Sequence, residues 1–316
     1  MMLDLLIYAA FFLVAALSYG IMCLGLNLQW GQTGLFNVGV AGFVAIGAYT
    51  SALLTTPEAV GRIGGFGLPI WIGWLAGSAA ASLAALIIGI ITLRLRADYL
   101  AITTFGIAAA IQLVALNAEG LTGGPFGIGF IPRPFAGFED RPMIFNLANL
   151  VLVSGVIAIV YTGLERLVRS PWGRVLRAIR EDETAATSLG KNANLFRLQA
   201  FALGSAIMGL GGAIQAHFIG FIAPDNYLSA LTFQVWAMLI IGGSGNNRGA
   251  IVGAVAVWAL WSLTGAALGA FVPAEHQARV AALQIVSIGI VLAGVLVVRP
   301  RGILGEAMTV SRFLRE

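Results

Sequence analysis

The chain has 316 residues, of which 59% are hydrophobic and 10% are charged, and its formal net charge is +4. Its mean hydropathy is +0.92. A soluble globular protein carries about 25% charged residues, so this composition excludes a water-facing surface of ordinary polarity. A bilayer solvates apolar side chains and requires only that backbone groups bond internally. The composition therefore predicts an all-α membrane protein.

Long apolar stretches follow one another along the chain. They cover residues 5–28, 34–56, 68–93, 100–116, 143–164, 195–222, 228–241, 249–271 and 280–298. A helix needs about 20 apolar residues to cross a bilayer, so most stretches qualify, whereas 228–241 is short enough to be re-entrant. We expect one polytopic helical bundle over 1–316 with about eight to ten spans. Because Asp4 stands where a signal peptide has basic residues, we expect the first stretch to be retained.

Small residues spaced four apart recur inside the apolar stretches. Gly73 and Gly77 form one such pair, and Ser205, Gly209 and Ala213 repeat the spacing. Small side chains let membrane helices approach closely. These patterns predict a packed bundle and carry no information about a solute.

The basic residues predict the orientation of the chain. Seven of them lie between Glu165 and Arg197, and four more follow residue 298. Cytoplasmic loops of membrane proteins carry an excess of lysine and arginine, so the loop around 170–190 and the tail 299–316 are expected in the cytoplasm. With nine crossings, the N-terminus lies outside and the C-terminus inside. The expected location is a bacterial inner (plasma) membrane.

The sequence offers little that would power transport from within the chain. Carriers coupled to ions usually place carboxylates or histidines inside the membrane, but here only His217 is an ionisable side chain well inside a stretch. Its pattern favours a packing role over proton transfer. A phosphate-binding loop requires Gly, four residues, then Gly-Lys-Ser/Thr, and the segment around Lys191 lacks the first glycine and the hydroxyl residue. An energy source on partner subunits is therefore expected.

Residues 170–190 predict an amphipathic helix in the cytoplasm. Ser170 and Pro171 are typical of a helix start, and Gly190 is typical of a helix end. Apolar residues recur at helical spacing and leave a charged opposite side. Glu181 follows Arg177 by one turn, the spacing of an ion pair. Such a helix either docks on a partner protein or rests on the inner membrane surface.

Four segments together resemble LivM-type permeases of branched-chain amino acid ABC transporters. The run 170–183, Ser-Pro-Trp-Gly-Arg-Val-Leu-Arg-Ala-Ile-Arg-Glu-Asp-Glu, resembles the cytoplasmic loop of that family. Residues 25–28 with 47–50, 93–102 with 121–125, and 220–225 with 241–245 resemble its other conserved blocks. The resemblance covers most of residues 20–305.

The resemblance implies an importer whose path alternately faces the two sides of the membrane. This chain would pair with a related second permease, two cytosolic ATPases would dock below, and a periplasmic or extracellular binding protein would deliver the solute. ATP and Mg²⁺ would bind the ATPases, so no cofactor and no metal is expected on this chain, which is no enzyme and binds no nucleic acid. The 170–190 loop would couple to the ATPases through Arg177, Arg180, Glu181, Asp182, Glu183, Ala185 and Gly190.

Polar or small residues inside apolar stretches have to face protein or water rather than lipid, which makes them candidates for lining the path. These candidates are Asn37, Gly39, Gly42, Tyr49, Thr103, Thr104 and Gln112. The resemblance implies branched-chain or related small amino acids as solutes. Phe126 departs from the family pattern, as do Asn37 and Val40, so urea, amides and other small organic solutes are the alternative. A passive channel or secondary carrier is a further one.

Overall fold

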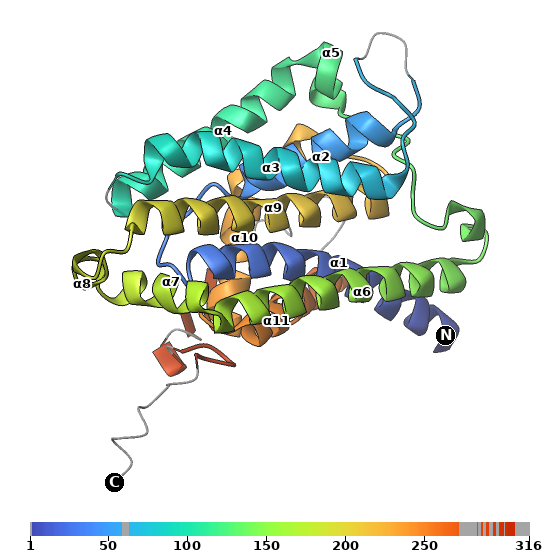
Figure 1. Ribbon diagram of the computed structural model, residues 1–316. Helices are drawn as coiled ribbons and strands as arrows, with labels where there is room; N and C mark the ends of the chain where they lie inside the picture. Colours follow the sequence, from blue (N-terminus) through green and yellow to red (C-terminus); the bar gives the residue numbers. More distant parts are fainter. Residues whose placement is uncertain are drawn as a thin grey trace.

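A computed structural model describes residues 2–58, 63–95, 97–271 and 301–306, together with positions 283, 286, 289, 290, 293, 294 and 297–299. Within these residues the regular structure is helical, apart from one antiparallel bridge between Ile128 and Ile222. The predicted all-α class is therefore confirmed. Figure 1 shows the long helices packed side by side, with α7 and α8 at one end of the bundle and α5 at the other.

The helices follow the apolar stretches in chain order. They are α1 (Met2–Gln29), α2 (Val40–Thr55), α3 (Ile70–Thr92), α4 (Ala97–Asn117), α5 (Glu119–Thr122), α6 (Pro142–Arg169), α7 (Pro171–Glu181), α8 (Glu183–Ser188), α9 (Ala193–Ile219), α10 (Ser229–Gly242) and α11 (Asn247–Phe271), with short 3₁₀ turns η1 (Gly124–Phe126), η2 (Ala136–Phe138) and η3 (Pro224–Tyr227). The first eight predicted stretches each contain a helix. The ninth, 280–298, lies largely outside the described residues.

Six of the described helices are long and apolar enough to cross a membrane: α1, α3, α4, α6, α9 and α11. Two more, α2 and α10, are apolar but shorter. In the most apolar part of α1 and of α9, 72% of the residues are buried, against 28% or less in α3, α4, α6 and α11. The two central helices therefore form the core, and the other four expose apolar surface as helices facing lipid or a partner do.

Helices α1–α3 and helices α9–α11 share one arrangement. Helix α1 has 28 residues, α2 has 16 and α3 has 23, while α9 has 27, α10 has 14 and α11 has 25. In each group a long helix is followed by an interruption, a short helix and another long helix. Figure 1 shows α1 and α9 running in opposite directions. This arrangement has the form of an inverted repeat with one interrupted helix in each half.

Candidate functional site

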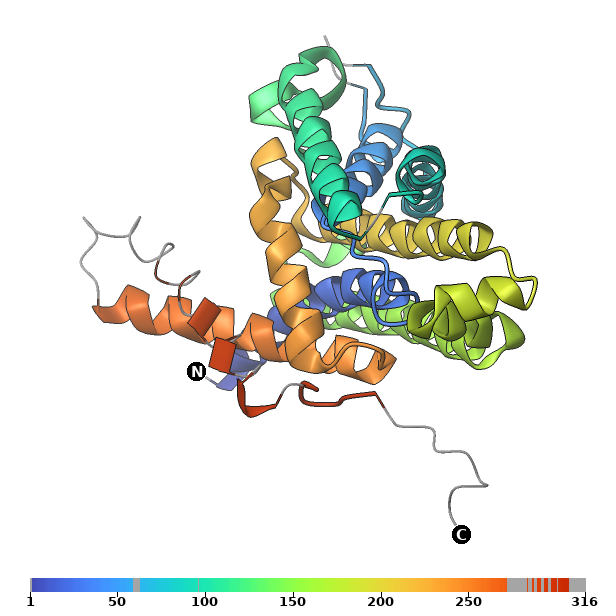
Figure 2. The ribbon, with the colours of Figure 1, turned by 90° about the vertical axis from the view of Figure 1, so that its left-hand side faces the viewer.

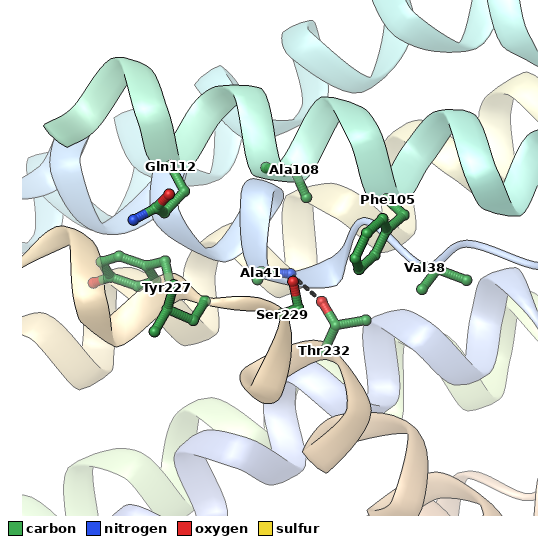
Figure 3. A pocket seen from close by; sticks show the side chains of 10 residues that line it. Val38, Ala41, Phe105, Ala108, Gln112, Tyr227, Ser229 and Thr232 are labelled. Atoms are coloured by element: carbon green, nitrogen blue, oxygen red, sulfur yellow. Dashed lines mark hydrogen bonds between the residues drawn. The ribbon is translucent and has the colours of Figure 1, made fainter. Parts of the chain in front are cut away.

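A small cavity lies where the two short helices meet α4. It has a volume of about 50 Å³ and is lined by Val38, Ala41, Phe105, Ala108, Ala109, Gln112, Tyr227, Leu228, Ser229 and Thr232. Figure 3 shows these side chains converging from α2, α4 and the start of α10. Figure 2 shows α4 and α10 on the same face of the bundle, where the Phe105 and Phe233 rings lie 6.4 Å apart.

The start of α2 is held inside the bundle by an interrupted segment, residues 30–39. Asn37 is fully buried, and its side chain donates to Gln29 Oε1 at 2.7 Å and accepts the Gly39 N–H at 2.7 Å. The Val38 N–H donates to Thr104 Oγ1 at 3.0 Å, and Trp236 Nε1 donates to the Asn37 carbonyl at 2.9 Å. Non-helical backbone at membrane depth is tolerated where protein satisfies it. These bonds explain why α2 begins at Val40 rather than at the predicted residue 34.

The start of α10 faces the start of α2 across the cavity. Residues 220–228 separate α9 from α10 without forming an α-helix. The Ala41 N–H donates to the Thr232 hydroxyl at 3.0 Å, the bond drawn in Figure 3. A helix N-terminus carries a partial positive charge from its unpaired N–H groups. Two such N-termini beside one cavity form the arrangement found at solute sites of transporters built from broken helices.

The path candidates from the sequence separate into one lining residue and several supporting ones. Gln112 lines the cavity. Gly39 and Gly42 pack so closely on α4 that a Cβ would lie 2.6 Å from the Thr104 carbonyl and 3.0 Å from Ala108, respectively. These glycines let α2 and α4 approach and so shape the cavity.

The remaining two path candidates are not part of the cavity lining. Thr103 donates to the Tyr99 carbonyl of its own helix at 2.7 Å. Tyr49 is buried, its hydroxyl has no hydrogen-bond partner, and its ring lies 5.8 Å from that of Tyr227, which lines the cavity.

Sequence reasoning missed the α10 side of the cavity, which contributes Ser229 and Thr232. A signal for it exists in the chain. The stretches 34–56 and 228–241 occupy corresponding places, and each follows a segment that contains glycine or proline. Such a matched pair of interrupted stretches points to a binding site between them.

The amphipathic segment forms two helices, α7 and α8, that pack on the bundle. Leu176 and Ile179 are fully buried, and Trp172 Nε1 donates to Gln199 of α9 at 2.8 Å. The apolar side of α7 is therefore covered by the chain itself, whereas Leu189 beyond α8 is exposed. Ser170 starts α7 as predicted, but its hydroxyl donates to the Leu167 carbonyl instead of capping the new helix.

The coupling candidates surround the break between α7 and α8. Asp182 accepts the Ala185 N–H at 2.9 Å and so caps α8. Glu183 pairs with Arg197 of α9 at 2.8 Å. Glu181 lies 3.8 Å from Arg180, so its partner is this arginine and not the predicted Arg177.

Two further candidates complete the surface. Ala185 is exposed in α8, and Gly190 has a positive φ of 77° just beyond the end of α8, the conformation typical of a residue that terminates a helix. The exposed residues Glu181, Asp182 and Ala185 thus face away from the bundle, whereas Arg180 and Glu183 bond to other parts of the chain.

Sequence comparisons match most of the chain to known proteins. The sequence model of the family described as "Branched-chain amino acid transport system / permease component" matches residues 8–297. The high-affinity branched-chain amino acid transport system permease protein LivM of Escherichia coli (strain K12) is 34% identical over 262 residues, which cover 75% of this chain and 59% of that protein. The chain thus spans less than two thirds of the length of this relative.

Two other relatives show the range of solutes named in the group. A probable branched-chain amino acid transport permease protein LivM from Methanocaldococcus jannaschii is 30% identical over 267 residues, covering 74% of this chain and 75% of that protein. The guanosine ABC transporter permease protein NupQ of Bacillus subtilis is 28% identical over 223 residues, covering 67% of each chain. No solved structure gives a significant match.

Proposed function

This chain belongs to the family of branched-chain amino acid transport system permease components, and from that premise we propose that it forms one half of the membrane path of an ATP-binding-cassette importer. The observation that carries the proposal is the cavity at which the starts of α2 and α10 meet. Non-helical backbone at membrane depth occurs where protein buries it or where it lines a path, and here two such breaks meet at one cavity. A bundle that served only as an anchor would have no need of two.

The proposed solute is a branched-chain or related small amino acid. Val38, Phe105 and Ala108 give the cavity an apolar wall, and Gln112 and Thr232 add polar groups, a mixture suited to a small amphipathic molecule. The alternative is another small organic solute, and the guanosine permease among the relatives favours keeping that alternative. At about 50 Å³ the cavity is far smaller than the roughly 300–1,000 Å³ of ligand pockets, so we propose that it widens when α4 and α10 separate.

The proposed partners follow from the same premise. A related second permease would cover the face of α4 and α10, because a cavity with polar groups and helix N-termini is not stable against lipid. Two ATPases would dock on the exposed charged sides of α7 and α8 and would bind ATP and Mg²⁺. A periplasmic or extracellular binding protein would deliver the solute at the opposite end.

We propose nine crossings, within the expected range of about eight to ten, with the N-terminus outside and the C-terminus in the cytoplasm. Helix α11 rises by about 1.5 Å per residue, so its last residue lies far from its first. The Ile303 N–H nevertheless donates to the Ile241 carbonyl, which lies beside the start of α11, at 2.8 Å. Residue 303 therefore lies at the same end of the bundle as the start of α11, which supports the proposed odd number of crossings. A membrane-impermeant thiol reagent applied to intact cells tests the orientation, because it would label Gly137→Cys near η2 and leave Ser188→Cys in α8 unlabelled.

Reconstitution in liposomes tests the function. With the second permease, both ATPases and a leucine-loaded binding protein, we expect uptake of radiolabelled leucine that requires ATP. Liposomes that contain this chain alone form the control and are expected to take up none. Uptake by the chain alone, without ATP, would instead establish a passive channel or secondary carrier. ATP-dependent uptake of guanosine or urea in place of leucine would replace the proposed solute while keeping the transporter class.

A further inference from the structure

Arg180 differs from the other arginines of α7 in where its side chain goes. It lies in the last turn of the helix, next to the fully buried Ile179, and only 23% of its side chain is exposed. One guanidinium nitrogen, Nη1, donates to the Gly31 carbonyl. The other, Nη2, lies 3.0 Å from the Glu306 carboxylate. A single side chain thus joins α7 to two segments that are distant in sequence.

The contact with Gly31 leads directly to the start of α2. Gly31 lies at the beginning of the interrupted segment, directly after Trp30. Gly34, which has a positive φ of 72°, packs against the aliphatic part of Arg180, so that a Cβ there would lie 3.2 Å from Arg180 Cγ. Three residues further on, Asn37 is tied to Gln29 and Trp236. Displacement of Arg180 would therefore move the segment that positions the first residues of α2.

The contact with Glu306 leads to the end of α10. The segment 301–306 lies along the last turn of that helix, where Leu304 N–H donates to the Gly242 carbonyl at 2.9 Å. A Cβ on Gly243 would lie 2.5 Å from the Leu304 carbonyl, so the two backbones are in close contact. The segment that contains Glu306 is therefore bonded to the end of α10, and Glu306 lies on the same side of the bundle as α7. With only 14 residues, α10 connects this contact to the cavity in about 21 Å.

We propose that Arg180 is a positioning residue that transmits movement of α7 to both interrupted helices at the same time. This inference rests on the proposed function, because it gives the ATPases a route to the cavity. An ATPase that pushes on the exposed side of α7 moves the guanidinium, which moves the 30–39 segment through Gly31 and the end of α10 through Glu306. Both cavity walls then respond to one input, as a coupled change between two discrete states requires.

The chemistry of arginine suits this role better than that of lysine. The guanidinium is planar and always charged, and it presents donors in a fixed fork. It can therefore hold a backbone carbonyl and a carboxylate together in one geometry. A lysine at position 180 would keep the charge but present a single point donor, and it would lose the simultaneous hold on both segments.

Three variants and a matched control test the inference in the reconstituted complex. Arg180→Gln removes the charge and the fork, Arg180→Lys keeps the charge, and Glu306→Gln weakens only the contact with the α10 segment. The control is Arg166→Gln, an exposed arginine in the last turn of α6 and outside the proposed docking surface. For each we would measure copurification of the ATPases, ATP hydrolysis, and leucine taken up per ATP hydrolysed.

We expect leucine uptake per ATP to fall roughly tenfold in Arg180→Gln, within the range of coupling between protein sites, while the ATPases copurify and hydrolyse ATP normally. Arg180→Lys and Glu306→Gln should give intermediate values, and Arg166→Gln the wild-type value. Unchanged uptake per ATP in both Arg180→Gln and Glu306→Gln would overturn the inference, and so would loss of the ATPases from Arg180→Gln, which would make Arg180 a docking residue. Neither result touches the proposed function, which fails only if the wild-type complex shows no ATP-dependent uptake.

Discussion

His217 lies deep in the bundle with both ring nitrogens hydrogen-bonded. Nδ1 is 2.7 Å from the Pro132 carbonyl, which can only accept, so Nδ1 carries the proton. Nε2 is then the acceptor for the Ser51 hydroxyl at 2.8 Å. The ring therefore joins α2, α9 and the segment before η2, and its hydrogen-bonding groups are committed to packing. Proton transfer would require breaking one of these bonds.

This arrangement predicts a stability effect without a transport effect. His217→Phe leaves the Pro132 carbonyl and the Ser51 hydroxyl unpaired, at a cost of about 1–3 kcal/mol for each buried group. We expect a lower Tm of the chain in detergent and a smaller decrease for Ser51→Ala. Uptake per folded complex should be unchanged and should not acquire a new dependence on pH. A complex that remains fully stable but loses transport would contradict the packing role.

Residues that act through their chemical type alone could be predicted from the sequence, whereas residues that act through their neighbours could not. The polarity of Gln112 inside an apolar stretch identified it as a candidate, and the structure places it in the cavity lining. The polarity of Asn37 gave the same indication, yet its groups are bonded within the interrupted segment. Whether a buried amide faces a cavity or a backbone depends on contacts with α4 and α10, which lie far away in sequence.

At the scale of elements, close helix contacts at small residues hold α2 in place. Gly47 of α2 lies against Gly209 of α9, and a Cβ on Gly47 would overlap the Gly209 carbonyl. Gly77 of α3 meets the same point, with its Cβ position 2.5 Å from the Gly47 carbonyl. The predicted small-residue pattern thus marks a crossing of three helices. Its spacing was visible in the sequence, but the identity of the partner helices was not.

This crossing predicts a sharp contrast between two glycines. Gly47→Val would force α2 away from α9, because the obstructing atoms belong to backbone that cannot turn aside. We expect loss of the folded chain or a strongly lowered Tm. Gly155→Val in the middle of α6 is the matched control, since a Cβ there meets nothing within 4 Å, and its Tm should stay near that of the wild type. Equal tolerance of both substitutions would show that the crossing contributes little.

The α7–α8 region illustrates where sequence patterns reach their limit. The amphipathic pattern predicted the helix and its charged side, and Gly190 its end. It did not predict the break at Asp182 or the pairing of Glu183 with Arg197 of α9, because both depend on how α9 returns past the loop. The apolar side is buried on the chain itself. The charged side is therefore the surface left for the proposed ATPases.

At the scale of the whole molecule, the cavity lies to one side of a buried central pair of helices. Helices α1 and α9 are the most buried long helices of the described part, and the cavity lies on the face formed by α4 and α10. The hydropathy of the chain predicted a membrane bundle, because burial in lipid is a property of composition. The inverted plan and the cavity required the structure, because they arise from the packing of α2 against α10 across more than half of the chain.

The central claim is that solute passes where α4 and α10 separate, and a reversible cross-link tests it most directly. In a Cys23→Ala background, Phe105→Cys and Phe233→Cys replace two aromatic rings whose centroids lie 6.4 Å apart. Treatment of the reconstituted complex with a short bismethanethiosulfonate should abolish leucine uptake, and reduction should restore it, while each single-cysteine variant treated in the same way should lose less uptake than the cross-linked complex. Uptake at the untreated rate in the fully cross-linked complex would contradict the account.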